Sequence, residues 1–526
     1  MRNLFLALLS GILFALSWPT NGLPILIFVA FVPLLLAEKQ IRLSAHKTKS
    51  KVFGLAFLCF LTWNLYTTGW LYYADLTGMI FAISFNTTMM SLVFLGYHMA
   101  AKRLSEPWSL VFLATLWMSF EYLHLQWDFS WPWLSLGNVF SEYISWIQWY
   151  EFTGTFGGAL WIWCANILVF KTFNTTDSYP VKFKRTFPKL VLLIGLPIVV
   201  SLWMFHSYEI KGEQKEVVVL QPNIDPYTEK YDNTNSSMTQ LLLEQTDAII
   251  TDNTEFVLAP ETVLAESLPF ERFLYSDVPT TLHNYIEKHP KAQFLWGIDT
   301  YDLFTDPSKA TRYSNRLRED LWGNFYNMAL LVNNDYNIQK YYKSKLVPGI
   351  ETFPIKPILE PLIGDIMLNL GGTISMKTIQ EQRSVFVAND QTLIAPIICY
   401  ESVYGEYVTG YVKNGAEFLA IITNDAWWSD TQAHKQHLSL ARLRAIETRR
   451  DIARSANTGI SAFINQKGEV VSQTKYDEKT ALLGKVTLNQ KKTIYVLVGD
   501  IIAKIAIGVM ATLFLVMLFR KSKTTI

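Results

Sequence analysis

The sequence is poor in cysteine and carries almost no net charge. Its 526 residues include three cysteines, and 46 Lys and Arg against 45 Asp and Glu give a formal net charge of +1. Three cysteines cannot form a disulfide framework, and the sequence contains no CxxC pair and no Cys/His cluster with metal-binding spacing. The near-zero net charge gives no sign of a nucleic-acid-binding surface. We therefore expect neither a metal nor a cofactor, and no nucleic-acid partner.

Hydrophobic residues, by contrast, are abundant. They make up 50% of the chain, and its mean hydropathy is positive. This composition is too apolar for an ordinary soluble protein and indicates a membrane protein with a soluble part. Thirteen of the 17 tryptophans precede residue 204, a clustering that is typical of aromatic belts at membrane interfaces.

Eight apolar runs predict the membrane-embedded segments. They cover residues 4–18, 23–37, 53–73, 79–100, 108–124, 146–170, 190–205 and 495–519. Most approach the roughly 20 residues that a helix needs to cross a bilayer. The first two runs are short and interrupted by Pro19, Pro24 and Pro33, so a tilted or re-entrant pair is the alternative there. A signal peptide is disfavoured, because no small-residue cleavage site follows the first run and further spans come directly after it. We expect seven transmembrane helices in residues 1–205 and an eighth at 495–519.

Lys and Arg residues are confined to alternate loops between these runs. The outside loops near residues 19–22, 74–78 and 125–145 contain neither residue type. The inside loops and the tail contain Lys39, Arg42, Lys47, Lys49, Lys51, Lys102, Arg103, Lys171, Lys182, Lys184, Arg185, Lys189, Arg520, Lys521 and Lys523. This is the positive-inside pattern, and it predicts cytoplasmic termini with residues 206–494 on the outer side of the membrane.

The region from about residue 212 to 490 has the pattern of a soluble α/β domain. Short β-rich runs occur at 217–221, 256–259, 294–298, 328–332, 393–398, 418–423 and 461–464, and helical patterns at 239–250, 403–413 and 434–452. Alternation of strands and helices indicates an α/β layered fold. About 280 residues are enough to bury a core independently.

Cys399 is the only cysteine outside the apolar segments, since Cys59 and Cys164 both lie in hydrophobic runs. It ends a predicted buried strand and is followed at once by Tyr400 and Glu401. A thiol held at a strand end can act as a nucleophile. The alternative is a small buried hydrophobic side chain, which is the commoner role of a single cysteine.

Two further strand ends carry residues that would complement a nucleophilic thiol. Glu261 follows a strand and a proline in FVLAPE, and Lys343 lies in YYKSKLVPGIE. A glutamate could accept the thiol proton as a general base, and a lysine could stabilise the oxyanion of a tetrahedral intermediate. Each residue by itself is more often an exposed surface group, so the prediction rests on all three occurring in one domain.

The ordered motifs APET, KSKLVP and ICYES resemble the nitrilase (carbon–nitrogen hydrolase) superfamily, whose Glu-Lys-Cys triad sits on an αββα sandwich. Further similar segments are ITNDAWW at 422–428, the helix containing 436–437 and 441–447, and RSANTG at 454–459. More narrowly, eight spans with such a domain between the last two resemble the apolipoprotein N-acyltransferase family. The segments FSWPWLSLG at 129–137 and QPNI at 221–224 are similar to that family too.

The resemblance implies roles for the matching residues. Glu261 would be the general base, Lys343 the oxyanion-stabilising lysine, Cys399 the nucleophile, Glu351 and Glu401 supporting carboxylates, and Tyr400 a neighbour of the nucleophile. The chain departs from the family pattern at Ala259, at Gly349-Ile350 and at Trp427-Trp428-Ser429, where the family often has Trp, Phe-Gly and Trp-Phe-Gly. These departures concern pocket shape and acyl preference.

The implied function is N-acyl transfer in a bacterial inner membrane, with the catalytic domain on the periplasmic face. A phospholipid would acylate Cys399, and the thioester would acylate the α-amino group of an N-terminal diacylglyceryl-cysteine on an apolipoprotein. The alternatives are a membrane-tethered amidase acting on a small amide, and a lipid- or lipoprotein-binding protein with an inactive nitrilase fold. A transporter is disfavoured, because the spans contain few ionisable residues.

Several other residues have two interpretations. His434 and His437 are three residues apart on one predicted helix and could bind a metal, although helix packing is the expected role. Glu121, within an apolar span, is either functional or bonded to a neighbouring helix. Trp131 and Trp133 are expected to be interfacial anchors, and Tyr231 to lie near the rim of the site.

Overall fold

The computed structural model describes residues 1–44, 47–173, 179–230, 232–334, 338–353 and 376–520. The chain divides into two compact units. The helical unit contains Met1–Tyr208 and Val498–Ile526, and the α/β unit contains Glu209–Leu497. Tyr231 and the basic tail residues Lys521 and Lys523 lie outside the described residues.

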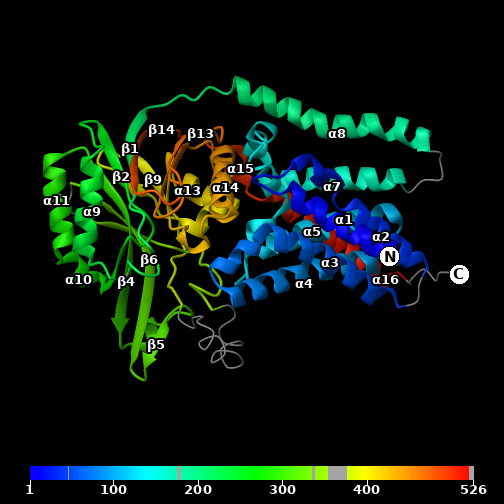
Figure 1. Ribbon diagram of the computed structural model, residues 1–526, viewed down its shortest axis with the longest axis horizontal. Coiled ribbons are helices and arrows are strands. Elements are labelled where there is room, and N and C mark those ends of the chain that lie inside the picture. Colours follow the sequence, from blue (N-terminus) through cyan, green and yellow to red (C-terminus); the bar gives the residue numbers. More distant parts are fainter. Residues whose placement is uncertain (45–46, 174–178, 231, 335–337, 354–375, 521–526) are drawn as a thin grey trace. The chain divides into compact units, whose positions relative to one another are not determined.

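The helical unit consists of α-helices joined by short 3₁₀ segments (Figure 1). Its α-helices are α1 (Arg2–Ser17), α2 (Val32–Ser44), α3 (Thr48–Thr68), α4 (Leu76–Ala101), α5 (Glu106–His124), α6 (Tyr150–Thr153), α7 (Thr155–Phe173), α8 (Tyr179–Ser207) and α16 (Ile501–Phe519). The principal 3₁₀ segments are η1 (Pro24–Val29), η2 (Gly69–Tyr73), η3 (Pro132–Leu134), η4 (Leu136–Phe140) and η5 (Ile144–Trp146).

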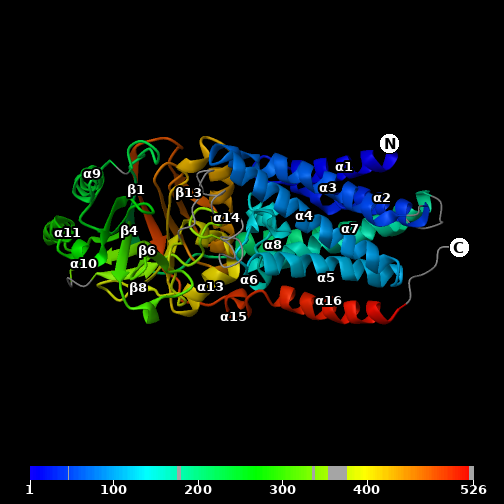
Figure 2. The same cartoon turned by 90° about the horizontal axis from the view of Figure 1, so that it is seen from below.

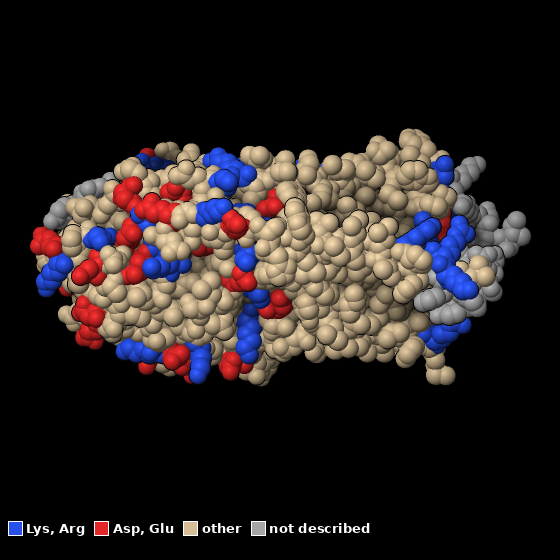
Figure 3. All heavy atoms as spheres, turned by 90° about the horizontal axis from the view of Figure 1, so that it is seen from above, with Lys and Arg blue, Asp and Glu red and all other residues tan. Residues whose placement is uncertain are grey.

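Six segments among the described residues are long and apolar enough to cross a membrane. They are Pro24–Leu43, Thr48–Tyr73, Leu76–Ala101, Thr155–Phe173, Lys184–Ser207 and Ile501–Phe519. The other two predicted spans correspond to α1, which has 16 residues, and to α5, which is not among the six. On the face seen in Figure 3, this unit has a broad zone without charged side chains, and cationic side chains gather at the end where the N-terminus lies. Such a surface fits a membrane-embedded unit.

Two helices begin later than the hydropathy predicts. The run at 146–170 begins with the last residue of η5 and contains α6 and then Gly154, whose φ of 60° ends α6 before α7 starts at Thr155. The run at 495–519 is likewise divided by Gly499, with a φ of 63°, into α15 (Ile494–Val498) and α16. A left-handed glycine ends a helix without lowering local hydropathy, so the apolar pattern did not reveal either break.

Glu121 bonds to a loop rather than to another transmembrane helix. Its Oε1 accepts hydrogen bonds from Trp117 Nε1 at 3.0 Å and from the Leu136 backbone N–H at 2.8 Å. Leu136 belongs to the aromatic segment 129–137, so Glu121 holds that segment against α5. Within the segment, Trp131 and Trp133 stack at 5.7 Å between ring centroids, and both contact Trp70. The contacts of Glu121 in this structure are therefore structural.

The α/β unit contains two β-sheets. The first has the order β14-β1-β2-β4-β6-β5, with β3 paired to β4 and β7 paired to β6; the second has the order β13-β12-β11-β10-β9-β8. The first sheet comprises β1 (Gln214–Gln221), β2 (Thr254–Leu258), β3 (Leu264–Pro269), β4 (Gln293–Phe304), β5 (Asn315–Arg318), β6 (Leu321–Val332), β7 (Gln339–Tyr342) and β14 (Thr480–Thr487). The second comprises β8 (Phe386–Val387), β9 (Leu393–Ile398), β10 (Phe418–Thr423), β11 (Ile452–Ala456), β12 (Ala462–Ile464) and β13 (Val470–Gln473).

Helices cover the outer faces of the two sheets (Figures 1 and 2). The helices α9 (Asn235–Asp247), α10 (Phe270–Leu274) and α11 (Asp277–Lys288) lie on the first sheet, and α13 (Gly405–Lys413) and α14 (Gln432–Thr448) on the second. The inner faces pack against each other, with Phe256 and Phe418 rings 5.5 Å apart and Ser455 Oγ donating to Leu220 O at 2.7 Å. The architecture is an αββα sandwich, which confirms the α/β class expected from the sequence.

The parallel strands bring several loops to one edge of each sheet. Strand β2 runs parallel to β1 and β4, and β10 runs parallel to β9 and β11. The carboxyl ends of parallel strands meet at a common edge, where α/β proteins usually build their sites. Glu261 follows β2, Lys343 follows β7 and Cys399 follows β9.

We expect Asp451 to make the α/β unit less stable at neutral pH than at pH 4. Its Oδ2 accepts from the Thr487 backbone N–H at 2.6 Å, and burial raises its pKa from 3.8 to about 6. A carboxyl group whose pKa is higher in the folded state than in the unfolded state stabilises the fold while it is protonated. This contribution is complete below the unfolded-state pKa and is lost as the pH rises from about 4 to 6. The loss is up to about 3 kcal/mol. In thermal melts, Asp451→Asn should therefore be stabilising at pH 7.5 and nearly neutral at pH 4.

The exposed residue Asp252 provides the matched control, since Asp252→Asn should leave the melting temperature unchanged at both pH values. A stability difference for Asp451→Asn that does not vary with pH would contradict this explanation.

Candidate active site

Glu261 is positioned by an unusual turn after β2. Pro260 ends the strand pairing, and Thr262 has a left-handed φ of 45°. The turn lies directly against Gly297 of β4, where an added Cβ would be 2.4 Å from the Pro260 carbonyl oxygen and 2.8 Å from the Glu261 Cα. Glycine at position 297 is therefore required for the turn to pack so closely on the sheet.

The Glu261 carboxylate is buried and fully hydrogen-bonded, with 7% of the residue exposed. Oε1 accepts from Lys343 Nζ at 2.8 Å and from Asn327 Nδ2 at 2.7 Å, and Oε2 accepts from the Asn424 backbone N–H at 3.2 Å. Burial acts to raise the pKa of Glu261, but the Lys343 ammonium outweighs it and holds the pKa below its usual value. Glu261 is thus a carboxylate that can accept a proton.

Lys343 is shared between two carboxylates. Besides Glu261, its Nζ contacts Glu351 Oε1 at 2.9 Å and Oε2 at 2.8 Å, while Asn327 Nδ2 also donates to Glu351 Oε1 at 2.9 Å. The Val347 backbone N–H holds Glu351 Oε2 at 2.9 Å. Burial acts to lower the pKa of Lys343, but the two carboxylates raise it well above its usual value. A permanent cation therefore lies in a buried site.

Cys399 begins the 3₁₀ turn η7 (Cys399–Val403) in a left-handed conformation, with a φ of 49°. It is 7% exposed. Burial raises the pKa of the thiol and the nearby Glu261 charge raises it further, whereas Lys343 and a hydrogen bond with Thr423 act in the opposite direction. The net effect is a raised pKa, so the resting group is a thiol that has both Glu261 and Lys343 within electrostatic reach.

Glu401 links the lysine and cysteine segments. It is completely buried and accepts from Tyr341 Oη (2.6 Å), Tyr407 Oη (2.7 Å), Tyr411 Oη (3.3 Å), Ser344 N (2.7 Å) and Ile398 N (2.8 Å). Ser344 follows Lys343 and Ile398 precedes Cys399, so a single carboxylate fixes both strand ends. Tyr400 is 4% exposed and packs edge-on against Tyr404, with 5.2 Å between ring centroids.

The structure thus brings Glu261, Lys343, Glu351 and Cys399 together, with Glu401 and Tyr400 immediately beside them. It adds two residues that the sequence analysis did not predict. Asn327 bridges the two carboxylates, and Asn424 binds Glu261 through its backbone. Asn327 could have been noticed as a polar residue directly before the apolar run 328–332. Asn424 lay in the quoted motif at 422–428, but no role was assigned to it.

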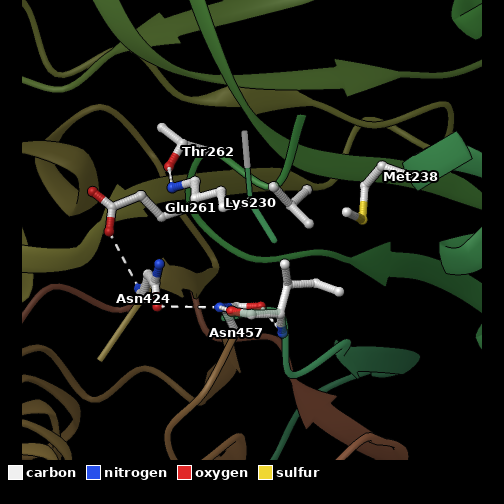
Figure 4. A pocket seen from close by; sticks show the side chains of 8 residues that line it. Lys230, Met238, Glu261, Thr262, Asn424 and Asn457 are labelled. Carbon is white, nitrogen blue, oxygen red and sulfur yellow. Dashed lines mark hydrogen bonds between the residues drawn. The ribbon is translucent and has the colours of Figure 1, made fainter. Parts of the chain in front are cut away.

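A small pocket adjoins Glu261 and has room for about one water molecule (Figure 4). Its lining includes Lys230, Thr262, Asn424 and Asn457 at the polar end and Met238 at the apolar end. Lys230 Nζ donates to Thr262 Oγ1 at 2.6 Å, and burial lowers the pKa of this second lysine. Lys230 was not predicted from the sequence.

The two helical histidines have separate environments. His434 stacks on Tyr476, with 4.3 Å between ring centroids, whereas His437 contacts Ser402 and Asp425. Their rings do not converge on a common metal position, so helix and loop packing is the role that the structure supports.

Comparisons with known proteins agree with this arrangement. A family model for the apolipoprotein N-acyltransferase N-terminal domain matches residues 10–168, and one for carbon-nitrogen hydrolases matches residues 313–494. Apolipoprotein N-acyltransferase from Chlorobaculum tepidum is 28% identical, over 99% of this chain and 97% of its own length. The Geobacter metallireducens protein of the same name is 26% identical, over 95% of this chain and 92% of its own length.

Solved structures were compared as well. A nitrilase-superfamily protein from Saccharomyces cerevisiae has a TM-score of 0.36 at 14% identity and covers 53% of this chain and 92% of its own. An amidase from Nesterenkonia has a TM-score of 0.35 at 11% identity, over 55% of this chain and 94% of its own.

Within the αββα unit, residues 313–494 match the carbon–nitrogen hydrolase family model. The N-terminal family model and the two relatives, which match over nearly their full length, extend the similarity to the helical unit. The chain is similar to apolipoprotein N-acyltransferases over nearly its whole length.

Proposed function

We propose that this protein transfers a fatty acyl chain from a membrane phospholipid to lipoproteins through a thioester on Cys399. The acceptor is the α-amino group of an N-terminal diacylglyceryl-cysteine. The observation that carries the proposal is the buried contact between the Glu261 carboxylate and the Lys343 ammonium beside the Cys399 thiol. Acyl transfer to apolipoproteins is the activity stated in the names of the relatives.

In the first half-reaction, Glu261 accepts the Cys399 proton as the sulfur attacks the ester carbonyl carbon of the phospholipid. Because the resting group is a thiol, proton removal accompanies attack rather than preceding it. The tetrahedral oxyanion is stabilised by Lys343, whose charge is preorganised by Glu261 and Glu351. The carbon–oxygen bond to the glycerol then breaks, the lysophospholipid oxygen takes the proton from Glu261, and a thioester remains on Cys399.

In the second half-reaction, the acceptor amine attacks the thioester carbonyl carbon. Glu261 accepts a proton from the amine nitrogen, and Lys343 again stabilises the oxyanion. Breaking the carbon–sulfur bond releases the N-acylated lipoprotein, and the sulfur regains its proton from Glu261. No metal or cofactor takes part in this scheme.

The membrane context follows from the substrates. Six helices among the described residues are long and apolar enough to span a bilayer, which supports an acyl donor drawn from the lipid phase. The distribution of Lys and Arg among the loops supports cytoplasmic termini and a periplasmic α/β domain in a bacterial inner membrane.

The test is intact-mass spectrometry of the purified protein after incubation with phospholipid vesicles. We expect a mass gain of one fatty acyl group on Cys399, and its discharge by a diacylglyceryl-cysteine peptide. Discharge by water at the same rate as by the peptide would favour an amidase-type hydrolase. A folded protein that never gains an acyl group would contradict the proposal and favour a binding protein.

A further inference from the structure

A chain of buried polar side chains lies next to the Cys399 backbone. Ser402 Oγ donates to the Cys399 carbonyl oxygen at 2.7 Å and lies 3.1 Å from His437 Nε2. His437 Nδ1 is 2.9 Å from Asp425 Oδ1, and Arg454 donates to Asp425 Oδ2 at 2.6 Å. All four side chains are at most 1% exposed. The four residues lie in the motifs quoted from the sequence, but neither the sequence analysis nor the proposed mechanism gives this chain of side chains a role.

The His437 ring joins the two ends of this chain. A serine hydroxyl carries one hydrogen, and that of Ser402 is donated to the Cys399 carbonyl, so Ser402 Oγ is left to accept from His437 Nε2 at 3.1 Å. On the other side of the ring, Nδ1 lies 2.9 Å from Asp425 Oδ1 and 3.3 Å from Arg454 Nη2. The Asp425–Arg454 pair therefore orients the ring that contacts Ser402.

Asp425 is held as a carboxylate at the far end of the path. Burial acts to raise its pKa, but Arg454 and His437 together hold the pKa well below its usual range. Thr423 Oγ1 also donates to Asp425 Oδ1 at 3.0 Å, and Thr423 is hydrogen-bonded to the Cys399 thiol. Asp425 thus reaches Cys399 by a second route, through the side chain.

The backbone that this chain contacts is strained. A left-handed conformation costs a non-glycine residue about 1–2 kcal/mol, and it sets the direction in which the Cys399 side chain leaves the backbone. Two bonds flank the residue: Glu401 accepts from Ile398 N on one side, and Ser402 donates to Cys399 O on the other. Releasing either bond would let the nucleophile relax away from its position.

We propose that His437 is a positioning residue that, through Ser402, holds the Cys399 backbone in its left-handed conformation. In this proposal His437 acts through Ser402 on the Cys399 carbonyl. The inference rests on the proposed function for its effect on acyl transfer, but the geometry of Cys399 can be tested independently.

The experiment uses two substitutions that each keep one half of the imidazole. Glutamine places an amide N–H near the Nε2 position and can still donate to Ser402, whereas asparagine keeps a donor only towards Asp425. The set is His437→Gln, His437→Asn, Ser402→Ala and the combination of the last two. His434→Gln is the matched control, because His434 is equally buried on the same helix and stacks on Tyr476.

Two rates are measured on the full-length protein below the melting temperature of each variant. One is alkylation of Cys399 by iodoacetamide, localised by peptide mass, and the other is acyl-enzyme formation from phospholipid vesicles. We expect His437→Asn and Ser402→Ala to slow acyl-enzyme formation by about 10- to 100-fold, because small misplacements of reacting groups cost factors of that size. His437→Gln should stay within about threefold of the wild type, and the double variant should lose no more than either single variant.

Equal losses in the Gln and Asn variants, or additive losses in the double variant, would overturn the positioning role. An unchanged rate in Ser402→Ala would do the same, and this small change also covers the case in which the His437 variants fold poorly. A wild-type protein that forms no acyl-enzyme would contradict the proposed function instead. The alkylation rates would still report on whether His437 positions Cys399.

Discussion

Replacing Cys399 by alanine should abolish both half-reactions while leaving the fold intact. Without the sulfur no thioester can form, so we expect the acyl-enzyme mass to disappear and transfer to a lipoprotein peptide to fall by at least about 1,000-fold. The side chain is small and the substitution introduces no polar group, so the melting temperature should change little. Intact-mass spectrometry and a peptide-acylation assay measure the two effects.

The matched control is the double variant Cys59→Ala and Cys164→Ala, which leaves Cys399 as the sole thiol. It should form acyl-enzyme at the wild-type rate, because both residues lie in helices of the helical unit. An acyl adduct that persists in Cys399→Ala, or vanishes in the control, would assign the nucleophile to another residue.

Replacing Lys343 by methionine should have the second large effect, on activity and stability together. The ammonium is shared by the buried carboxylate of Glu261 and the partly buried carboxylate of Glu351, and removing it leaves both charges uncompensated. The pKa of Glu261, now held down by Lys343, should rise, so the general base becomes protonated. We expect acyl-enzyme formation to fall by about 10²–10³-fold or more and stability by about 3–5 kcal/mol. Single-turnover kinetics and thermal melts measure the two quantities.

Adding Glu351→Gln to Lys343→Met separates the two effects. Neutralising one carboxylate removes part of the buried repulsion, so the double variant should regain stability without regaining activity. Equal recovery of stability and activity would mean that Lys343 acts only by supporting the fold. Near-wild-type acyl-enzyme formation in Lys343→Met would contradict its assignment to the oxyanion.

The α/β class could be predicted because the strands are short, apolar and rich in β-branched residues, whereas the αββα sandwich was implied by the family resemblance. All seven strand segments expected from the sequence overlap strands in the structure, including β9 and β10, whose predicted bounds are identical. Strand β11 was not predicted, and its first residue, Ile452, was assigned to the end of a helix because it continues the apolar spacing of α14. The left-handed Arg449 ends that helix, and such a conformation leaves little trace in the pattern.

The site was only partly visible in the sequence. Glu261, Lys343 and Cys399 could be selected because each charged or nucleophilic group follows an apolar strand. Asn327 and Asp425 could not, because their roles depend on which strands become neighbours. Asn327 reaches Glu261 across 66 positions of sequence, and Asp425 reaches Arg454 across 29. Pairings of this kind are fixed by sheet order rather than by local spacing.

Burial of Cys399 has a consequence for the durability of the enzyme. Peroxides and disulfides react with thiolates, and exposed low-pKa cysteines are the first to be oxidised. Cys399 is 7% exposed and the pKa of its thiol is raised, so between turnovers it is protonated, and oxidants attack the protonated form slowly. The group becomes strongly nucleophilic only while a carbonyl carbon lies against it and Glu261 takes its proton. Under the proposed periplasmic placement of the α/β unit, this burial protects an unpaired cysteine from oxidation between turnovers.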